Sequence, residues 1–432
     1  MSKYSTFIFE SYEFDITSKE LRLNYSYDDK LHFTESYKFD FPFVNNIDPL
    51  VIDKAVQNIF FMAGVSYYKM YLSPKIQIDS GNMSADDAVF YAETYQKGLG
   101  EFFYVNQLDP RYHIDFPITS RPVPAVRASG NGQLIGLGGG KDSLLSTELL
   151  RKGEQTIKTW SLGHKSQLEP LVERIGLEHK WVSRHMDPQI IRLNKLDAYN
   201  GHVPISAILA SVGTLVSILA GTRDLVVSNE QSANEPTLEY DGVSINHQYS
   251  KSQEFEQNYQ IFLERHFGGT QRYYSLLRPF TELFIAELFA GIGFDKYHDV
   301  FSSCNSAYKG DARQIFWDGT CPKCAFVFLI LTPYVNREKL ELLFNGNNLL
   351  LDESLNTIFN SLLGIAGDKP LECVGSIAES RQAMRLAQSI YPELSGYKFE
   401  FSDSNDAISH LMPNDVFSKL QSSISSIAKR PE

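Results

Sequence analysis

Hydrophobic and polar residues alternate along the first 45 positions, as in β-strands with one buried face. The alternating segments are 5–16, 20–29 and 30–42. Asp28, Asp29 and Lys30 suit a hairpin turn between the last two. The period then becomes helical over 49–72 and 84–105. Residues 1–125 are therefore expected to form an N-terminal α+β domain, a strand meander followed by helices.

Residues 108–132 are rich in Pro, Gly and polar residues, which is typical of a linker. After this segment, strand and helix patterns alternate along the chain. Strands are predicted over 132–138, 155–163, 178–187 and 222–232, and helices over 141–153, 168–177 and 203–221. This alternation predicts an α/β domain over 126–330, a parallel sheet with helices on both faces. The rest, 331–432, is expected to be a helical C-terminal region, with helical patterns over 336–345, 351–366, 377–391 and 417–432.

Composition and charge weigh against a membrane protein, a secreted protein and a nucleic-acid-binding protein. The most apolar stretch, 203–221, contains Pro, Gly, Ser and Thr and is borderline in length for a bilayer, so a buried helix is favoured. The first residues lack the apolar core of a signal peptide, and a cytoplasmic protein without membrane insertion is expected. A net charge of −12 weighs against a nucleic-acid partner. The sequence indicates no oligomeric state.

A glycine-rich turn lies between the first strand and first helix of the α/β pattern. It contains Gly138, Gly139, Gly140, Lys141, Asp142 and Ser143, here called the glycine loop. A Walker A loop is excluded because Ile135 stands where its first glycine belongs and Asp142 follows the lysine. A dinucleotide fingerprint is excluded because Lys141 replaces its third glycine.

The glycine loop resembles the S-G-G-x-D-S pyrophosphate loop of the ATP-pyrophosphatase (adenine nucleotide α-hydrolase-like) superfamily, which implies that fold, ATP and Mg²⁺. Glycines let backbone amides approach phosphates, and a helix N-terminus attracts anions. Ser143 can add a hydroxyl, Lys141 a positive charge, and Asp142 can bind Mg²⁺ or hold the loop. Gly138 departs from the superfamily pattern, which has Ser. The alternative is a strand-to-helix turn that binds nothing.

A second polar stretch, 226–256, follows the predicted strand 222–232 and should meet the glycine loop at the same sheet edge. Asn229 and Glu230 are expected to contact the nucleotide, and Asp142, Glu230 and Glu235 are candidate Mg²⁺ ligands, since Mg²⁺ prefers oxygen. His247 and Lys251 could bind an anionic substrate or move protons. The alternative is a solvated surface loop.

Cysteines suggest a further site. Cys321 and Cys324 form a CxxC, and with Cys304 they could bind Zn²⁺ if His298 or Cys373 supplied a fourth ligand. A reduced buried pair or a substrate-lining cysteine are the alternatives. Cys373, in a Gly/Pro-punctuated loop, is also an acid/base candidate.

Several motifs occur in a fixed order along the chain: GLGGGKDS, SNEQSANE, INHQYSKSQEFE, FSSCN, WDGTCPKCAFVFL and KPLECVGS. Together they resemble the ATP-dependent UDP-N-acetylmuramoyl-L-alanyl-L-glutamate epimerase family of bacterial peptidoglycan synthesis, over about residues 125–385. The resemblance implies a UDP-muramyl dipeptide substrate whose terminal L-Glu α-carboxylate is adenylated, with pyrophosphate and then AMP released.

Adenylation explains why an epimerase would use ATP. A proton beside a carboxylate is very weakly acidic, whereas the neutral acyl group allows an enolate that nearby donors can stabilise. Reprotonation on the opposite face would give D-Glu. The candidates for the proton acceptor and donor are His247, Lys251, Cys304 and Cys373, and the sequence does not choose among them.

Other functions are compatible with the glycine loop. A 7-cyano-7-deazaguanine synthase-like enzyme would be shorter and have more closely spaced cysteines, and a tRNA-modifying enzyme would need a basic face. A non-catalytic adenine nucleotide-binding module would keep the loop but would not need the second polar stretch.

Overall fold

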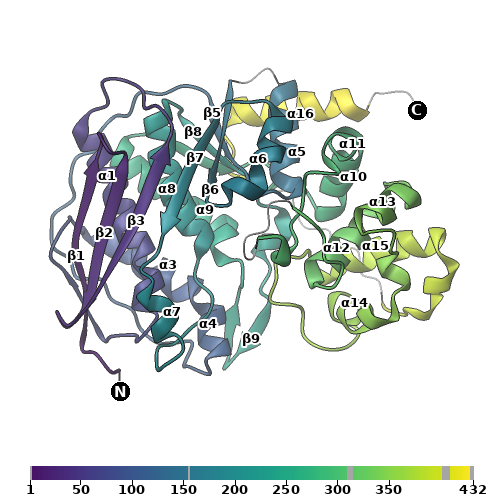
Figure 1. Ribbon diagram of the computed structural model, residues 1–432, viewed down its shortest axis with the longest axis horizontal. Helices are drawn as coiled ribbons and strands as arrows, with labels where there is room; N and C mark the ends of the chain where they lie inside the picture. The colour runs from purple at the N-terminus through teal and green to yellow at the C-terminus, as the bar shows by residue number, and fades with distance from the viewer. Residues whose placement is uncertain (1, 154–155, 309–314, 401–408, 429–432) are drawn as a thin grey trace.

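A continuous sheet lies in the left half of the molecule as drawn in Figure 1. The computed structural model describes residues 2–153, 156–308, 315–400 and 409–428. In this part of the chain the sheet has nine strands, in the order β11-β8-β5-β6-β7-β3-β2-β1-β4. The strands are β1 (Thr6–Asp15), β2 (Glu20–Tyr27), β3 (Leu31–Asp40), β4 (Lys75–Ile78), β5 (Gln133–Gly136), β6 (Ile157–Leu162), β7 (His179–His185), β8 (Asp224–Val227) and β11 (Arg272–Ser275).

The strands β7, β6, β5, β8 and β11 form a parallel block. Their spatial order corresponds to 3-2-1-4-5 in chain order, that of a doubly wound sheet. From β5 the chain adds strands on one side, β6 and then β7, and afterwards on the other side, β8 and then β11, so the order reverses between β5 and β8. Ligands in such sheets bind beyond the carboxyl ends of the strands at that point, and the glycine loop follows β5 directly.

Both faces of the parallel block are buried. Neighbouring residues on one strand enter different cores, as Leu134 and Ile135 of β5 do, because side chains alternate across a strand. The first core includes helices α1 (Pro49–Ala63), α3 (Ala85–Gly98), α8 (Ile205–Ala220) and α9 (Gln253–Phe267). The second includes α5 (Lys141–Lys152), α6 (Lys165–Ile175) and α10 (Glu282–Ile292). The predicted parallel sheet with helices on both faces is confirmed.

The N-terminal strands extend this sheet. β3 pairs antiparallel with β7, which places Phe39 opposite Val182. The predicted meander is confirmed, and Asp28 and Asp29 turn the chain with positive φ angles of 51° and 52°. The sheet therefore crosses the boundary expected near residue 125, and the boundaries at 125 and 330 stay predictions.

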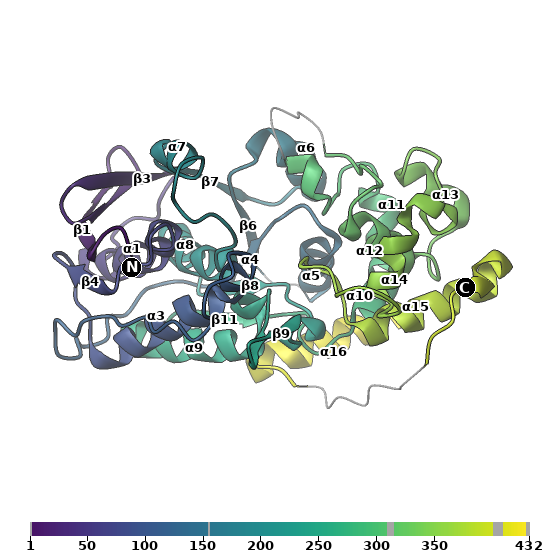
Figure 2. The ribbon, with the colours of Figure 1, turned by 90° about the horizontal axis from the view of Figure 1, so that it is seen from below.

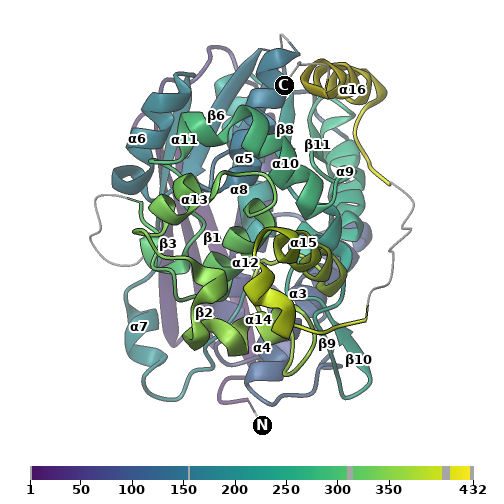
Figure 3. The same cartoon turned by 90° about the vertical axis from the view of Figure 1, so that its right-hand side faces the viewer.

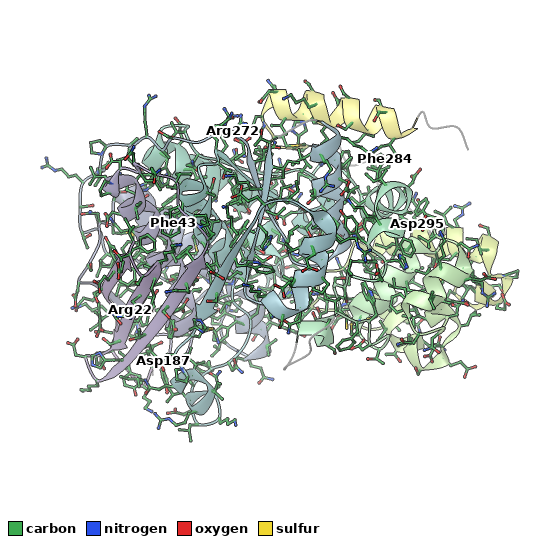
Figure 4. All side chains as sticks on the ribbon, turned by 45° about the horizontal axis from the view of Figure 1, so that its top comes forward. Arg22, Phe43, Asp187, Arg272, Phe284 and Asp295 are labelled. Carbon is green, nitrogen blue, oxygen red and sulfur yellow. The ribbon has the colours of Figure 1, made fainter. Side chains whose placement is uncertain are left out.

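The C-terminal helices gather at the opposite end of the molecule from β1–β3, as Figures 1 and 2 show; in Figure 3, which looks along the long axis, they lie in front of these strands. They are α12 (Pro322–Leu331), α13 (Arg337–Leu343), α14 (Asn356–Leu362) and α15 (Ile377–Ile390). The last helix, α16 (Asn414–Ala428), returns to the parallel block, where Arg272 of β11 (labelled in Figure 4) pairs with Asp415 at 3.4 Å. The helix predicted over 417–432 is thus observed as far as Ala428, and 429–432 lie outside the described residues.

Several elements differ from the sequence prediction. The polar stretch 226–256 is not a loop throughout, because it holds the hairpin β9 (Leu238–Tyr240) and β10 (Val243–Ile245) and the start of α9. The two N-terminal helical stretches are each divided, which adds α2 (Val65–Tyr68) and α4 (Gly100–Val105). The strands β4 and β11 and the helices α7 (Gln189–Leu193), α10, α11 (Phe294–Tyr297) and α12 were not predicted. Four-residue strands are too short to display an alternating pattern.

The apolar segment 203–221 forms the buried helix α8, as expected. Among the described helices, none has the length and apolar composition needed to span a membrane.

Candidate functional site

The glycine loop connects β5 to α5 with the geometry of an anion-binding turn. Gly140 is the N-cap of α5, and the structure gives no side-chain cap for this helix among the described residues. Gly139 has a φ of +88°, which favours glycine. A Cβ built at Gly138 would meet no atom within 4 Å. The first turn of α5 therefore borders the space beside the loop without a side-chain cap on its amides.

That space is a cavity of about 250 Å³, here called the loop cavity. Its lining includes Gly138, Gly140, Lys141, Asp142, Ser143, Ser228, Asn229, Lys251, Glu282, Ser303, Lys323 and Cys373. The structure thus brings the glycine loop together with Asn229, Lys251 and Cys373, which lie far apart in the sequence. A neighbouring cavity of about 200 Å³ shares Gly138, Asn229 and Lys251 and continues along β6 past Trp160 and Leu162.

Lys141 pairs with two carboxylates beside the loop cavity. Its side chain is buried, and its ammonium donates to Asp142 at 2.5 Å and to Glu282 at 2.6 Å. Burial disfavours the charged lysine, but these two carboxylates raise its pKa above the ordinary value. The expectation that Lys141 neutralises phosphate charge stays a prediction, and Lys251 and Lys323 are further ammonium groups that line the loop cavity.

Glu282, at the N-terminus of α10, was not identified from the sequence. Burial, together with the charges of Asp142 and Glu230, raises its pKa to about 8, although Lys141 opposes the shift. Its backbone amide donates to the buried Glu379 carboxylate at 2.6 Å. Carboxylates thus gather beside Lys141 in the loop cavity.

The three predicted Mg²⁺ ligands do not all lie in this group. Asp142 lines the loop cavity, and Glu230 is close enough to affect Glu282 electrostatically. Glu235 instead lies 4.0 Å from Lys369, with a half-exposed side chain. Among the described residues, Asp142, Glu230 and Glu235 do not form a compact cluster of potential metal ligands.

His247, Lys251 and Cys373 come together as one group. Lys251 is the last residue of the short helix η2 (Tyr249–Lys251), which begins just after His247. The Nζ atom of Lys251 lies 3.1 Å from Cys373 Sγ. His247 lies close enough to Cys373 for each group to shift the pKa of the other. On its other side His247 hydrogen-bonds to Glu101 of α4, and His202 lies 3.3 Å from the same carboxylate.

These neighbours change the protonation of the group. Burial tends to raise the pKa of Cys373, but Lys251 and His247, with a contribution from Lys323, lower it to about 6. Burial tends to lower the pKa of His247, but Cys373 and Glu101 raise it to about 9. At neutral pH the pair is therefore a thiolate and an imidazolium, the form in which cysteine accepts protons.

The remaining cysteines form a separate cluster. Cys321 Sγ lies 3.5 Å from Cys324 Sγ and 4.0 Å from Cys304 Sγ. The fourth group is Asp318, with Oδ1 at 3.2 Å from Cys324 Sγ. Neither fourth ligand considered from the sequence lies in this cluster, since His298 packs on Phe294 and Cys373 pairs with Lys251. Cys304 therefore lies with the other two sulfurs, a placement that does not favour it as an acid/base group.

The segment around Cys304, residues 302–308, contacts the glycine loop. Ser302 donates its backbone N–H to Gly139 O at 3.0 Å. The Tyr308 hydroxyl lies 3.1 Å from Gly138 O and 2.9 Å from Ser302 O. These contacts fix the backbone of Gly138 and Gly139.

Comparison with known proteins identifies the family. Residues 1–276 match the family model of the MurL N-terminal domain, and residues 300–395 match that of the MurL C-terminal domain. The chain belongs to the MurL family. The glycine loop, Lys251 and His247 lie in the first matched region, and Cys373 and the cysteine cluster in the second.

Relatives in this family are similar over most of their length. A protein of Xanthomonas oryzae pv. oryzae (strain MAFF 311018) is 37% identical over 393 residues, 89% of this chain and 86% of the relative. Proteins of Micromonospora sp. (strain ATCC 39149 / NRRL 15099 / SCC 1413) and Salinispora tropica are each 36% identical over 394 residues. These two alignments cover 89% of this chain and 87% and 85% of the relatives. All three are named UDP-N-acetyl-alpha-D-muramoyl-L-alanyl-L-glutamate epimerase.

Proposed function

We propose that this chain is an ATP-dependent epimerase that converts UDP-MurNAc-L-Ala-L-Glu to the D-Glu epimer in peptidoglycan precursor synthesis. The observation that carries the proposal is the loop cavity itself. One wall is a glycine loop suited to pyrophosphate, and another carries a Cys373 thiol beside two cationic groups. The names of the three relatives supply the substrate.

ATP would occupy the two adjoining cavities. The amides of Gly139 and Gly140, Ser143 and the α5 N-terminus would hold the β and γ phosphates. The neighbouring cavity, with Trp160 and Leu162 in its walls, offers the apolar surface that an adenine ring needs. The carboxylate donors also fit Mg²⁺, which Asp142 and Glu230 would hold. Bound there, Mg²⁺ would neutralise phosphate charge.

The chemistry would take place in two stages. First, the substrate α-carboxylate attacks the α phosphate of ATP, the bond to the β phosphate breaks, and pyrophosphate leaves. Lys251 lines both cavities, so its ammonium would neutralise the negative charge of the phosphates where the two cavities meet. The acyl group formed is neutral, so its α-proton becomes more acidic.

The Cys373 thiolate would then take the α-proton, and the electron pair of the C–H bond would move into an enolate. Lys251 and His247 hold the sulfur in its anionic form and so position the base. Because these groups contact one another, they serve the same face of the substrate. A proton from solvent, delivered at another wall of the cavity, would protonate the enolate carbon on its other face and give the D-Glu acyl-adenylate. Water would then hydrolyse this to the product and AMP, and Cys373 would return its proton to solvent.

Product analysis tests this function. Purified protein with ATP, Mg²⁺ and UDP-MurNAc-L-Ala-L-Glu should release pyrophosphate and AMP, and chiral analysis of the hydrolysed product should show D-Glu. The product epimer and free L-Glu serve as comparison substrates, and a reaction without ATP as the control. Epimerisation without ATP, or pyrophosphate release without D-Glu, would contradict the proposal.

Epimerisation should depend on pH through the Cys373–His247 pair. Below about pH 6 the thiolate is protonated and kcat/KM should fall. Loss of the imidazolium above about pH 9 leaves the thiolate in place, so no comparable fall is expected there. Because the two groups interact, the apparent pKa of the acid limb belongs to the pair. Lys251, Lys323 and His247 face the sulfur, and Glu101 and His202 face the imidazole. In Lys251→Met the acid limb should move to higher pH. A profile flat from pH 5 to 10 would contradict the assignment.

A further inference from the structure

We propose that Cys304, Asp318, Cys321 and Cys324 bind a Zn²⁺ ion in a tetrahedral structural site. The four ligand atoms all lie within 4.8 Å of one another. Zn–S bonds of about 2.3 Å place two sulfurs about 3.8 Å apart at a tetrahedral angle. The sulfur separations of 3.5 and 4.0 Å lie on either side of this value.

The surroundings orient the four donors toward one point. The Cys304 backbone amide donates to Ser302 Oγ at 3.0 Å, which fixes the backbone that carries this cysteine. Ser306 Oγ donates to Asp318 Oδ2 at 2.6 Å, and the Thr320 amide donates to Oδ1 at 2.9 Å. The carboxylate is therefore held in place by groups that are not themselves ligands, as in protein metal sites.

A disulfide is the other chemistry available to a CxxC. Its S–S bond would be about 2.05 Å, whereas Cys321 Sγ and Cys324 Sγ lie 3.5 Å apart and all three cysteines are free. The third sulfur and the carboxylate converge on the same point, which a disulfide between two cysteines does not require. The set Cys₃Asp provides four ligands and so leaves no open position, which indicates a structural ion rather than a catalytic one.

The ion would join two segments that border the loop cavity. Cys304 lies directly after Ser302, whose amide donates to Gly139 O, and Ser303, which lines the loop cavity. Cys321 and Cys324 lie at the start of α12, whose residues Lys323, Phe326 and Val327 line the cavity. Zinc would thus fix both walls relative to each other. This supporting role rests on the proposed function, but the metal site itself does not.

Metal analysis of the full-length protein tests the site independently of activity. We expect about one zinc ion per chain by mass spectrometry of the purified protein, and Co²⁺ exchange should give the visible spectrum of tetrahedral thiolate-bound cobalt. Cys321→Ser and Asp318→Ala should lower zinc occupancy at least tenfold after dialysis against a mild chelator. Cys373→Ser, which removes a thiol outside the cluster, should retain zinc, and this would hold even if the protein lacked epimerase activity.

Three results would overturn the site. The first is folded wild-type protein, expressed with zinc in the medium, that contains no zinc. The second is a Cys321–Cys324 disulfide in the freshly purified protein, detected by peptide mass spectrometry. The third is zinc that persists in Cys321→Ser but is lost in His202→Gln, which would place the ion beside Glu101. If Cys321→Ser fails to fold, the wild-type zinc content and cobalt spectrum decide the question.

Discussion

Replacing Cys373 with serine should lower epimerisation by about 10²- to 10⁴-fold, the usual contribution of a positioned acid or base, while pyrophosphate release continues. A serine hydroxyl is too weakly acidic to form the anion that Lys251 and His247 stabilise in the native thiol. The glycine loop is untouched by the substitution, so adenylation should proceed. Pyrophosphate release and D-Glu formation, measured in the same reaction, separate the two stages.

Exchange in heavy water sharpens this test. In the native protein, deuterium should enter the α position of glutamate, whereas in Cys373→Ser this exchange should fall together with epimerisation. Pyrophosphate release in the same preparation reports on folding and ATP binding. If Cys373→Ser kept native epimerisation, the thiol could not be the base. Equal loss of both stages would assign Cys373 to substrate placement instead.

The glycine loop could be predicted from sequence because its determinants are local. A strand, three glycines and a helix occur within about 20 residues, and the structure reproduces that order. The same holds for the meander of β1, β2 and β3, whose hairpins follow one another in the chain. Local patterns of period 2 and 3.6 carry this information.

The surroundings of Cys373 could not be predicted in this way. The contact between Lys251 and Cys373 spans 122 residues, and that between Glu101 and His247 spans 146. Glu101 lies in an ordinary helical pattern, with no motif to distinguish it. Asp318 carries a weak signal, since it stands three residues before Cys321, but a lone aspartate near a CxxC is not diagnostic. Only the packing of α4, η2 and the segment before α15 brings these groups together.

Gly139→Ala should reduce ATP-dependent pyrophosphate release by at least about 10²-fold, since small misplacements of reacting groups cost rates of this order. At a φ of +88° any side chain is strained, by about 1–2 kcal/mol. The added Cβ would also lie 1.8 Å from the Tyr308 hydroxyl, which must therefore move. Its hydrogen bond to Gly138 O would then be lost, and the loop amides would no longer face the phosphates together.

Gly346→Ala separates the effect of backbone strain from the effect of the clash with the Tyr308 hydroxyl. Gly346 has a φ of +83°, close to that of Gly139, but a Cβ built there meets no atom within 4 Å. Gly346→Ala should therefore show the strain as a small fall in Tm with pyrophosphate release unchanged. Gly139→Ala should lose pyrophosphate release at temperatures well below its Tm, with weaker ATP binding by calorimetry. Native ATP binding in folded Gly139→Ala would show that the loop does not hold the nucleotide, because the contact that shapes the loop would have been broken without effect.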